Sequence, residues 1–367
     1  MNERDVFVIQ PYLKLMRYDK DYLVHEGINL VESINLKCIY YQTVGLEKIN
    51  PQTYLNSGYL TSLKKKIEFS KIDLVFFNIN LSPIQQRNLE NLIKSKVIDR
   101  TGLILEIFGS RARSNEGKLS VSLASLEYQK SRLVRSWTHL ERQRGGAGFM
   151  GGPGEKQIES DKRQLTQQIN RIKKKIRGID SIRNIQRYRR RKNNIPIVSL
   201  VGYTNSGKST LFNKLTKSDV LSKNMLFSSL DSTIRRSYFY DLHFLFVDTV
   251  GFIRDLPTTL IDAFKSTLDE IIFSDIIIHV RDISNEQNFF QKKEVLSILS
   301  EIGVNKDDKR IIEVINKVDL LKGKRDSYIS NDQNILMVSA LSGFGIDVLK
   351  KKISGFVKKN KRYKLLQ

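Results

Sequence analysis

The feature that most constrains this chain is the run Gly202-Tyr-Thr-Asn-Ser-Gly207-Lys208-Ser209, which fits the pattern G-x-x-x-x-G-K-[ST]. It follows an apolar segment, Ile197 to Val201, and leads into a segment that opens a helix near Lys208. A strand, a glycine-rich turn and a helix in this order let backbone N–H groups surround phosphate oxygens. The run therefore predicts a phosphate-binding loop, with Lys208 near the outer phosphates and Ser209 as a ligand of Mg²⁺.

A second segment supplies the other end of the phosphate site. His243 to Val247 is typical of a buried strand, and an Asp at its end can hold Mg²⁺ through a water while Gly251 leaves room for a terminal phosphate. We predict Lys208, Ser209 and Gly251 as catalytic residues. The predicted nucleotide contacts in the two segments are Gly202, Tyr203, Thr204, Asn205, Ser206, Gly207, Lys208, Ser209, Asp248, Thr249, Val250 and Gly251.

Two later strands end in residues that select the base. Ile311 to Ile315 is followed by Asn316, Lys317, Val318 and Asp319, and Ile335 to Val338 is followed by Ser339, Ala340 and Leu341. A carboxylate accepts hydrogen bonds from N1–H and the exocyclic amine of guanine, a donor pair that adenine lacks, so Asp319 specifies the base. Asn316 is expected to tie this loop to the phosphate loop. NKxD alone is a weak signal, but four motifs in order, each at a strand end, predict guanine-nucleotide binding.

The composition favours a polyanionic partner. Lys and Arg number 62 against 39 Asp and Glu, a formal net charge of +23, which favours phosphate neutralisation, although a well-solvated lysine-rich surface is the alternative. The single cysteine, Cys38, excludes an internal disulfide or a cysteine metal cluster. No apolar run is long enough for a membrane span, and the first residues lack a signal-peptide core. We expect a monomeric cytoplasmic protein that could associate transiently with ribosomes or a membrane.

The chain divides into four predicted parts, and the fold class is α/β. Residues 1–112 alternate strand-like and helical segments, residues 113–193 form a long antiparallel helical hairpin, residues 194–357 form the P-loop domain with a mostly parallel sheet and flanking helices, and residues 358–367 are a basic tail. The strand-like runs of the first part are Val6 to Ile9, Cys38 to Tyr41, Leu74 to Phe77 and Leu103 to Phe108. Its helical segments lie near Glu26 to Ile34, Thr53 to Ile67 and Ser82 to Lys94.

The hairpin is predicted from two apolar seams at heptad spacing: Leu119, Leu123, Leu126, Leu133, Trp137 and Leu140, then Leu165, Ile169, Ile172, Ile176 and Ile179. A glycine-dense link, 144–154, joins them; it either contacts a partner or merely closes the hairpin. Thirteen basic residues and one acid lie between Lys162 and Lys192. Such a stripe suits RNA phosphates, although a solvated face remains open. The predicted RNA contacts are Arg142, Arg144, Lys173, Lys174, Lys175, Arg189, Arg190 and Arg191.

Several longer motifs resemble those of the HflX-type ribosome-associated GTPases. They are Glu106-Ile107-Phe108, Arg111-Ala112-Arg113, Glu116 to Leu119, Gly152-Pro153-Gly154-Glu155 and Asp248 to Pro257. The resemblance implies a Mg²⁺-dependent GTP hydrolase that binds the large ribosomal subunit and its rRNA and splits stalled or idle ribosomes under stress.

The resemblance also implies a first switch that contacts GTP, at Phe227, Ser228, Ser229, Leu230 and Asp231. Ser229 stands where the family has a threonine that binds Mg²⁺, so the hydroxyl is kept and the methyl is lost. In the first part, a glycine-rich turn of the family is reduced to Asn56-Ser57-Gly58, which weakens the case for a second nucleotide site there.

Phe252 follows Gly251, where many GTPases place a glutamine that orients water. Because a phenyl ring cannot hydrogen-bond, we expect slow intrinsic hydrolysis that a ribosome accelerates. Two alternatives stay open: an RNA-remodelling, helicase-like enzyme, which the basic hairpin would suit, and a regulatory GTPase switch that acts on a protein partner.

Overall fold

The computed structural model is an α/β protein that describes residues 5–13, 19–137, 153–192, 194–218, 226–227, 232–321 and 335–359. The chain forms two compact units, one of Met1–Ser110 with Lys118–Ile176 and one of Arg111–Gly117 with Arg177–Gln367. The four-part division drawn from the sequence stays a prediction.

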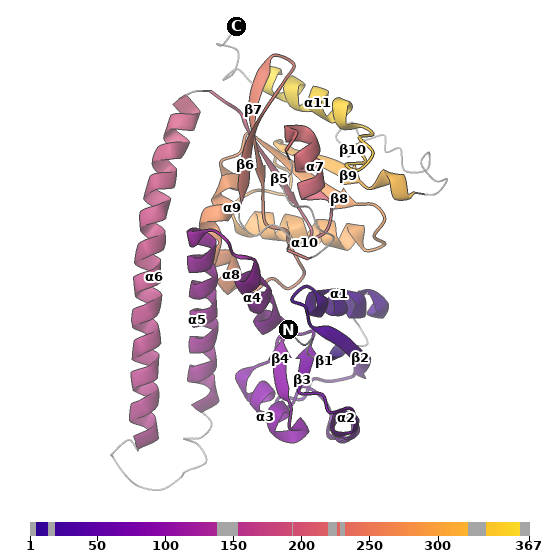
Figure 1. The fold of residues 1–367 in the computed structure, drawn as a ribbon, viewed down its shortest axis with the longest axis vertical. Helices are drawn as coiled ribbons and strands as arrows, with labels where there is room; N and C mark the ends of the chain where they lie inside the picture. The colour runs from indigo at the N-terminus through magenta and orange to yellow at the C-terminus, as the bar shows by residue number, and fades with distance from the viewer. Residues whose placement is uncertain are drawn as a thin grey trace. The chain divides into compact units, whose positions relative to one another are not determined.

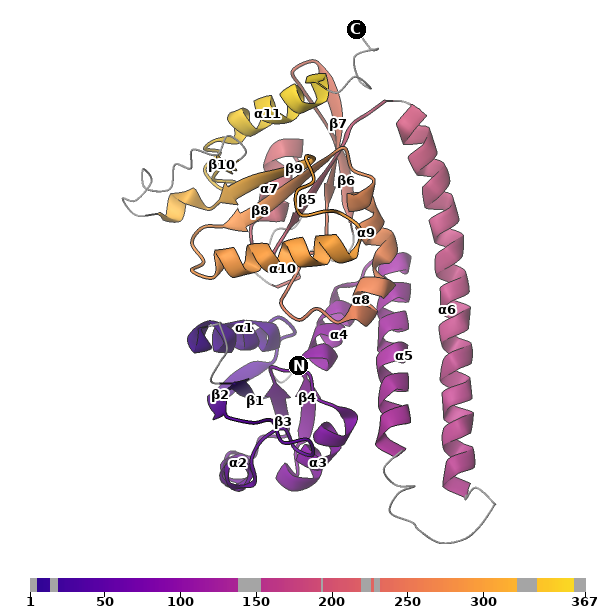
Figure 2. The ribbon, with the colours of Figure 1, turned by 180° about the vertical axis from the view of Figure 1, so that it is seen from behind.

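The first unit contains a four-stranded parallel sheet in the order β2-β1-β3-β4 (Figure 1). Its strands are β1 (Asp5–Leu13), β2 (Lys37–Leu46), β3 (Leu74–Phe77) and β4 (Lys96–Asp99). Helices α2 (Ser57–Ser70) and α3 (Pro83–Ile93) cover one face, and α1 (Lys20–Glu32) covers the other (Figures 1 and 2). Helices on both faces explain why the run Val6 to Ile9 in β1 is apolar without alternation, with Phe7 and Ile9 buried beside Val6 and Val8.

Two sequence expectations for this unit had opposite outcomes. Helix α3 begins at the predicted position, because Ser82 Oγ accepts from Gln85 N at 3.2 Å and Gln85 Oε1 accepts from Ser82 N at 2.9 Å. The prediction of a strand at Leu103–Phe108 was wrong, because these residues lie in helix α4 (Arg100–Arg111). Leu103, Ile104, Leu105, Ile107 and Phe108 are all buried, so the run lacks the polar stripe that would have marked a helix.

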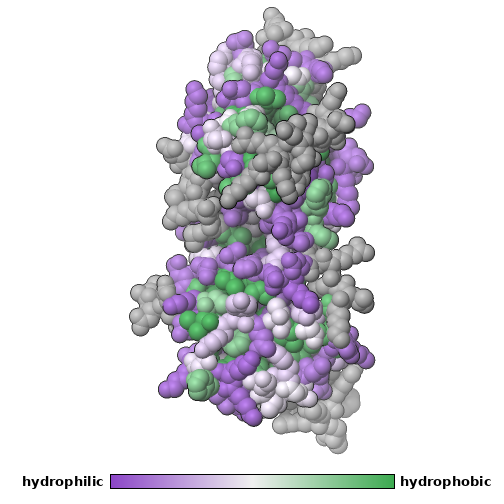
Figure 3. All heavy atoms as spheres, turned by 90° about the vertical axis from the view of Figure 1, so that its right-hand side faces the viewer, coloured by the Kyte–Doolittle hydropathy of each residue, from purple (hydrophilic) through white to green (hydrophobic). Residues whose placement is uncertain are grey.

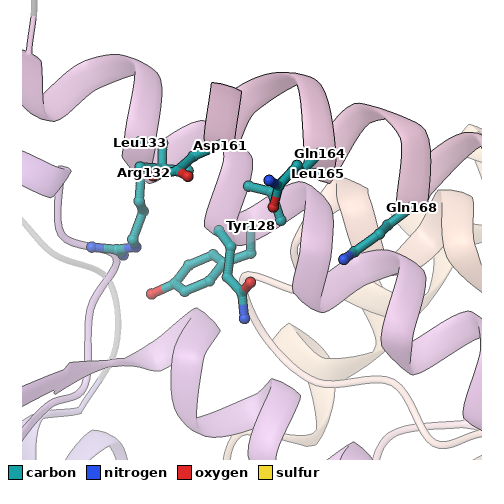
Figure 4. A pocket seen from close by; sticks show the side chains of 8 residues that line it. Tyr128, Arg132, Leu133, Asp161, Gln164, Leu165 and Gln168 are labelled. Atoms are coloured by element: carbon teal, nitrogen blue, oxygen red, sulfur yellow. The ribbon is translucent and has the colours of Figure 1, made fainter. Parts of the chain in front are cut away.

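Helices α5 (Asn115–Trp137) and α6 (Pro153–Lys192) are the two predicted long helices, and both ribbon views show them side by side. The predicted seam is packed at Leu123 and Ile169, which are buried. Farther along, Leu133 and Leu165 line an open cavity of about 530 Å³ together with Tyr128, Gln129, Arg132, Asp161, Gln164 and Gln168 (Figure 4). The seam is therefore not continuous. The link residues 144–152 lie outside the described ranges.

Asp99, at the end of β4, attaches α5 to the sheet of the same unit. Its Oδ1 accepts from the Tyr128 hydroxyl at 2.6 Å, and its Oδ2 accepts from Arg132 at 2.6 Å. The Arg132 guanidinium lies over the Tyr128 ring, 4.3 Å from its centre. Burial and the neighbouring carboxylate raise the pKa of Tyr128, so its hydroxyl stays a donor.

The second unit is built on a six-stranded sheet in the order β10-β9-β8-β5-β7-β6. All neighbouring strands are parallel except β6 and β7. The strands are β5 (Ile197–Gly202), β6 (Thr233–Phe239), β7 (Leu242–Asp248), β8 (Ile276–Asp282), β9 (Ile311–Asn316) and β10 (Ile335–Met337). Helices α7 (Lys208–Thr216) and α11 (Ile346–Lys359) share one core with the sheet. Helices α9 (Lys265–Ile272) and α10 (Asn288–Glu301) cover its other face (Figures 1 and 2).

This topology places the predicted motifs at one edge of the sheet. β5 is central, and Gly202, Asp248, Asp282 and Asn316 each close a parallel strand. The carboxyl ends of parallel strands share one edge, where ligands of open α/β sheets bind.

Among the coloured residues on the face drawn in Figure 3, hydrophilic and hydrophobic ones are interspersed. Within the described ranges, no helix is both long and apolar enough to cross a lipid bilayer.

Candidate nucleotide-binding site

The phosphate loop has the conformation that its glycines permit. Gly207 is the N-cap of α7 with φ 89°, a left-handed conformation that favours glycine. A Cβ on Gly207 would collide with the Asn316 side-chain nitrogen, and one on Gly202 would collide with the Val280 carbonyl oxygen. The backbone can therefore approach a ligand at the N-terminus of α7, where N–H groups attract anions.

Lys208 reaches back across this loop. Its Nζ donates to Gly202 O at 3.2 Å and to Tyr203 O at 2.8 Å, and the residue is 5% exposed. Burial lowers the pKa of Lys208 from its usual value to about 8, while the nearby Asp248 carboxylate opposes the shift. An anionic ligand would compensate the buried cation, which is the electrostatic condition for binding phosphate.

Ser209 and Asp248 provide adjacent oxygen atoms. The Ser209 hydroxyl donates to Asp248 Oδ2 at 2.7 Å, and both residues are buried. Hydroxyl and carboxylate oxygens are the ligands that Mg²⁺ prefers, so this pair fits the ion that the sequence predicted. The third predicted metal ligand, Ser229, lies outside the described residues.

Gly251 lies against the phosphate loop. A Cβ at this position would lie 3.0 Å from Lys208 Nζ and 3.0 Å from Thr204 Cα, so a side chain would displace one of them. Hydrogen bonds connect the next residues to the loop: Thr204 N donates to Phe252 O at 2.7 Å, and Phe252 N donates to Gly202 O at 3.1 Å. The two predicted phosphate segments are thus brought into direct contact.

Among the remaining residues of these segments, Thr249 is buried and donates to Leu200 O at 2.6 Å, and Val250 is buried. Thr204 Oγ1 and Ser206 Oγ are buried and have no hydrogen-bond partner within the described ranges. Because buried hydroxyls normally bond to something, both are candidates for contact with a ligand. Asn205 is exposed, with φ 61°.

The loops that the sequence predicts to select the base meet the phosphate loop through Asn316. Its Nδ2 donates to Ser206 O at 2.9 Å and its Oδ1 accepts from Ala340 N at 2.9 Å, so the predicted tie is present. Asp319 is exposed and Val318 is buried. Ser339 is buried, and Leu341 is 75% exposed.

Sequence reasoning missed Asp282, which ends β8 between the phosphate and base loops. Its Oδ2 forms an ion pair with Lys317 Nζ at 2.7 Å, and its Oδ1 accepts from Ser284 N at 3.0 Å. Lys317 has φ 64°, so the ion pair holds a strained residue in place. A carboxylate at the end of an apolar strand was the available signal.

Other predicted positions are less completely placed. Phe227 is buried, whereas Ser228, Leu230 and Asp231 lie outside the described residues. Arg142 and Arg144 also lie outside the described residues. The backbone of Arg189, Arg190 and Arg191 belongs to α6, but their side chains are outside the described part.

On α6, Lys174 and Lys175 are exposed. Lys173 forms an ion pair with Glu127 at 2.7 Å but keeps a side chain that is 45% exposed. The described part of the basic stripe is therefore partly neutralised by acidic residues of this chain.

Models of three protein regions match this chain. Residues 21–109 match a GTP-binding GTPase N-terminal region, residues 111–190 a GTP-binding GTPase middle region, and residues 197–317 a 50S ribosome-binding GTPase. The solved complex of SsGBP with GDP is 25% identical, with a TM-score of 0.52, over 97% of this chain and 99% of that one.

Two relatives named GTPase HflX align over most of the chain. The protein of Magnetococcus marinus is 46% identical over 89% of this chain and 76% of its own length. That of Escherichia coli is 40% identical over 89% of this chain and 77% of its own length. With the phosphate loop and its strand-end motifs assembled on one sheet edge, these matches show that the chain belongs to the HflX family of GTPases and is a GTP-hydrolysing enzyme.

Proposed function

We propose that the chain binds the large ribosomal subunit and, in its GTP-bound state, dissociates stalled or idle ribosomes. The observation that carries this proposal is the exposed basic surface of α6 on a chain that also holds a GTPase site. Lys162, Arg163, Arg171, Lys174, Lys175 and Arg177 are all exposed on α6. The ribosome-binding description of the model that matches 197–317 supports the same partner.

The geometry of the site supports the nucleotide roles that we propose. Lys208 and the N–H groups at the start of α7 would bind the phosphates, and Gly251 would approach the terminal one. Asp319 would accept hydrogen bonds from guanine, and Asn316 would keep the base and phosphate loops in register. Thr204 and Ser206 would contribute hydroxyl groups.

Mg²⁺ would be held by the Ser209 hydroxyl and, through a water, by Asp248, with Ser229 as a further ligand. When bound, it would neutralise charge that develops on the phosphate oxygens. The buried oxygen pair at 2.7 Å fits such an ion.

Intrinsic hydrolysis should be slow because Phe252 lies where other GTPases orient water with glutamine. The Phe252 ring is 1% exposed and cannot accept or donate a hydrogen bond. We expect the ribosome to accelerate hydrolysis by ordering the switches or supplying a polar group. Single-turnover hydrolysis with and without ribosomes tests this, and fast hydrolysis by the free protein would contradict it.

The test of the partner is sedimentation with purified ribosomes through sucrose in the presence of GDP, a non-hydrolysable GTP analogue, or no nucleotide. We expect co-migration with the large subunit and loss of intact ribosomes in the analogue sample. No co-migration in any sample would exclude the ribosome and favour free RNA or a protein partner.

A pair of matched variants tests the basic surface. Lys174→Ala with Lys175→Ala removes two exposed helical lysines from α6, and Lys351→Ala with Lys358→Ala removes two from α11. Each contact between a lysine and a phosphate releases counterions. The α6 variant should therefore bind ribosomes more weakly than the α11 variant does, and its affinity should depend less steeply on salt concentration. Equal losses in both variants would mean that net charge, not this surface, sets the affinity.

A further inference from the structure

One arginine of the basic helix is turned into the protein. Arg187 of α6 is buried, and its Nε donates to Glu270 Oε1 of α9 at 3.1 Å. Its guanidinium lies over the Phe273 ring, 4.8 Å from the ring centre, and NH1 lies 3.8 Å from Asp269 Oδ2. Arg187 therefore does not belong to the surface that RNA could reach, and it holds α6 against α9.

The residue that Arg187 binds is also connected to the strand that carries the phosphate loop. The Glu270 carbonyl accepts from Ser274 Oγ at 2.6 Å and from Ser199 Oγ at 3.4 Å, and the two hydroxyls lie 2.5 Å apart. Ser199 lies in β5, the strand that ends at Gly202. Glu270, Ser274 and Ser199 are all buried.

Helix α9 also follows, along the chain, residues 248–257, which resemble the second switch of the family. Residues 248–257 are followed by the short helix α8 (Thr258–Ala263) and then by α9. Gly251 of this segment contacts the phosphate loop, so a bound terminal phosphate would alter the position of the segment. A shift of this segment would reach α9 through a short connection.

We propose that Arg187 is a positioning residue that couples the nucleotide state to the basic helix. Separating a buried ion pair leaves charges without a partner and away from water, which is strongly unfavourable, so α6 must follow α9. α6 runs unbroken from Pro153 to Lys192 and also carries Lys174 and Lys175. The inference rests on the proposed ribosome function: Arg187 makes affinity for the large subunit depend on GTP without itself contacting RNA.

The test measures the affinity of the protein for large ribosomal subunits in the presence of the GTP analogue and in the presence of GDP, and takes the ratio of the two affinities. The main variant, Arg187→Met with Glu270→Gln, removes both buried charges and keeps a side chain over Phe273. The matched control is Arg183→Met, which breaks the ion pair to Glu116 of α5 (2.7 Å) one turn earlier on α6. Arg187→Lys keeps a cation beside Glu270.

We expect wild type and Arg183→Met to bind at least about 5-fold more tightly with the analogue. In the double variant this ratio should fall to about 1, while nucleotide affinity and intrinsic hydrolysis change by less than about 2-fold. Arg187→Lys should retain most of the ratio. An unchanged ratio in the folded double variant would overturn the proposal, as would its loss in Arg183→Met.

A measurement on the protein without ribosomes distinguishes the proposed coupling through Arg187 from the proposed binding to ribosomes. Amide hydrogen exchange over 177–187 should differ between GDP and the analogue in wild type but not in the double variant. If wild type shows this difference without binding ribosomes, the proposed partner is wrong and the coupling stands. If wild type shows no difference, the coupling is wrong.

Discussion

Asn316 offers the sharpest test of how the site is assembled, because one buried side chain joins two loops. Asn316 is 1% exposed, donates to Ser206 O and accepts from Ala340 N, each at 2.9 Å. In Asn316→Ala, a buried carbonyl and a buried N–H lose their partner. Each such group costs about 1–3 kcal/mol, so the free energy of unfolding should fall by about 2–6 kcal/mol.

The loss should also weaken nucleotide binding. The Asn316 side chain keeps the base and phosphate loops in register, but it does not touch the terminal phosphate. The affinities for GDP and GTP should therefore both fall, by roughly 10-fold or more. Asn316→Asp keeps the acceptor for Ala340 N but places a carboxylate oxygen opposite Ser206 O. We expect it to destabilise the protein more than alanine does, since it buries an uncompensated charge.

Denaturant unfolding and titration with labelled GDP and GTP measure both effects. Asn50→Ala is the matched control, because Asn50 Oδ1 accepts from Gln52 N at 2.8 Å and Thr53 N at 3.3 Å in the first unit. It should lower stability without changing nucleotide affinity. Unchanged affinity in both Asn316 variants would refute the argument that this side chain organises the site.

Three further predictions follow from single side chains. Asp319→Asn should lower GTP affinity by about 100-fold or more and favour xanthosine triphosphate, measured by competition; an unchanged GTP preference would remove Asp319 from base selection. Burial lowers the pKa of His279 to about 3, so the unfolded state binds a proton first and stability falls as pH drops from 6.5 towards 3. Wild type should lose about 2 kcal/mol more than His279→Gln between pH 7 and pH 5, measured by denaturant unfolding, and parallel losses would contradict this. Ser82→Ala should cost about 1 kcal/mol of stability by thermal unfolding, and an unchanged midpoint would mean that the capping box contributes nothing.

The nucleotide site was predictable because its motifs are contiguous and lie at strand ends. A parallel sheet brings such ends together whatever lies between them, so Gly207, Asn316 and Asp248 could be expected at one edge. The contact between Asn316 and the phosphate loop followed from the same reasoning. The partner of Lys317 did not, because Asp282 belongs to no motif and its ion pair with Lys317 depends on how β8 and β9 are placed in the fold.

The secondary structure of the first unit shows where apolar patterns stop being informative. The bounds of β3 were predicted correctly from the sequence, because Leu74–Phe77 is a short apolar run between polar turns. The run at Leu103–Phe108 has the same appearance but belongs to a helix buried on most sides, and the strand β4 before it has only four residues, Lys96–Asp99. Hydrophobicity marks burial in both cases, and only a polar face distinguishes helix from strand.

Charge patterns are ambiguous in a similar way, and the ambiguity bears on function. In the sequence, α6 carries a run of charges that are almost all positive. In the structure, however, Arg183 is paired with Glu116, and Arg187 is paired with Glu270, which lies 83 residues away. A local sequence cannot reveal such partners, although burial of an arginine requires one. Among the side chains of α6 that the structure describes, the exposed cations that can meet RNA phosphates therefore lie within 162–177. This stretch spans roughly 22 Å of helix, and the two paired arginines instead hold the end of α6 to Glu116 and Glu270 of the second unit.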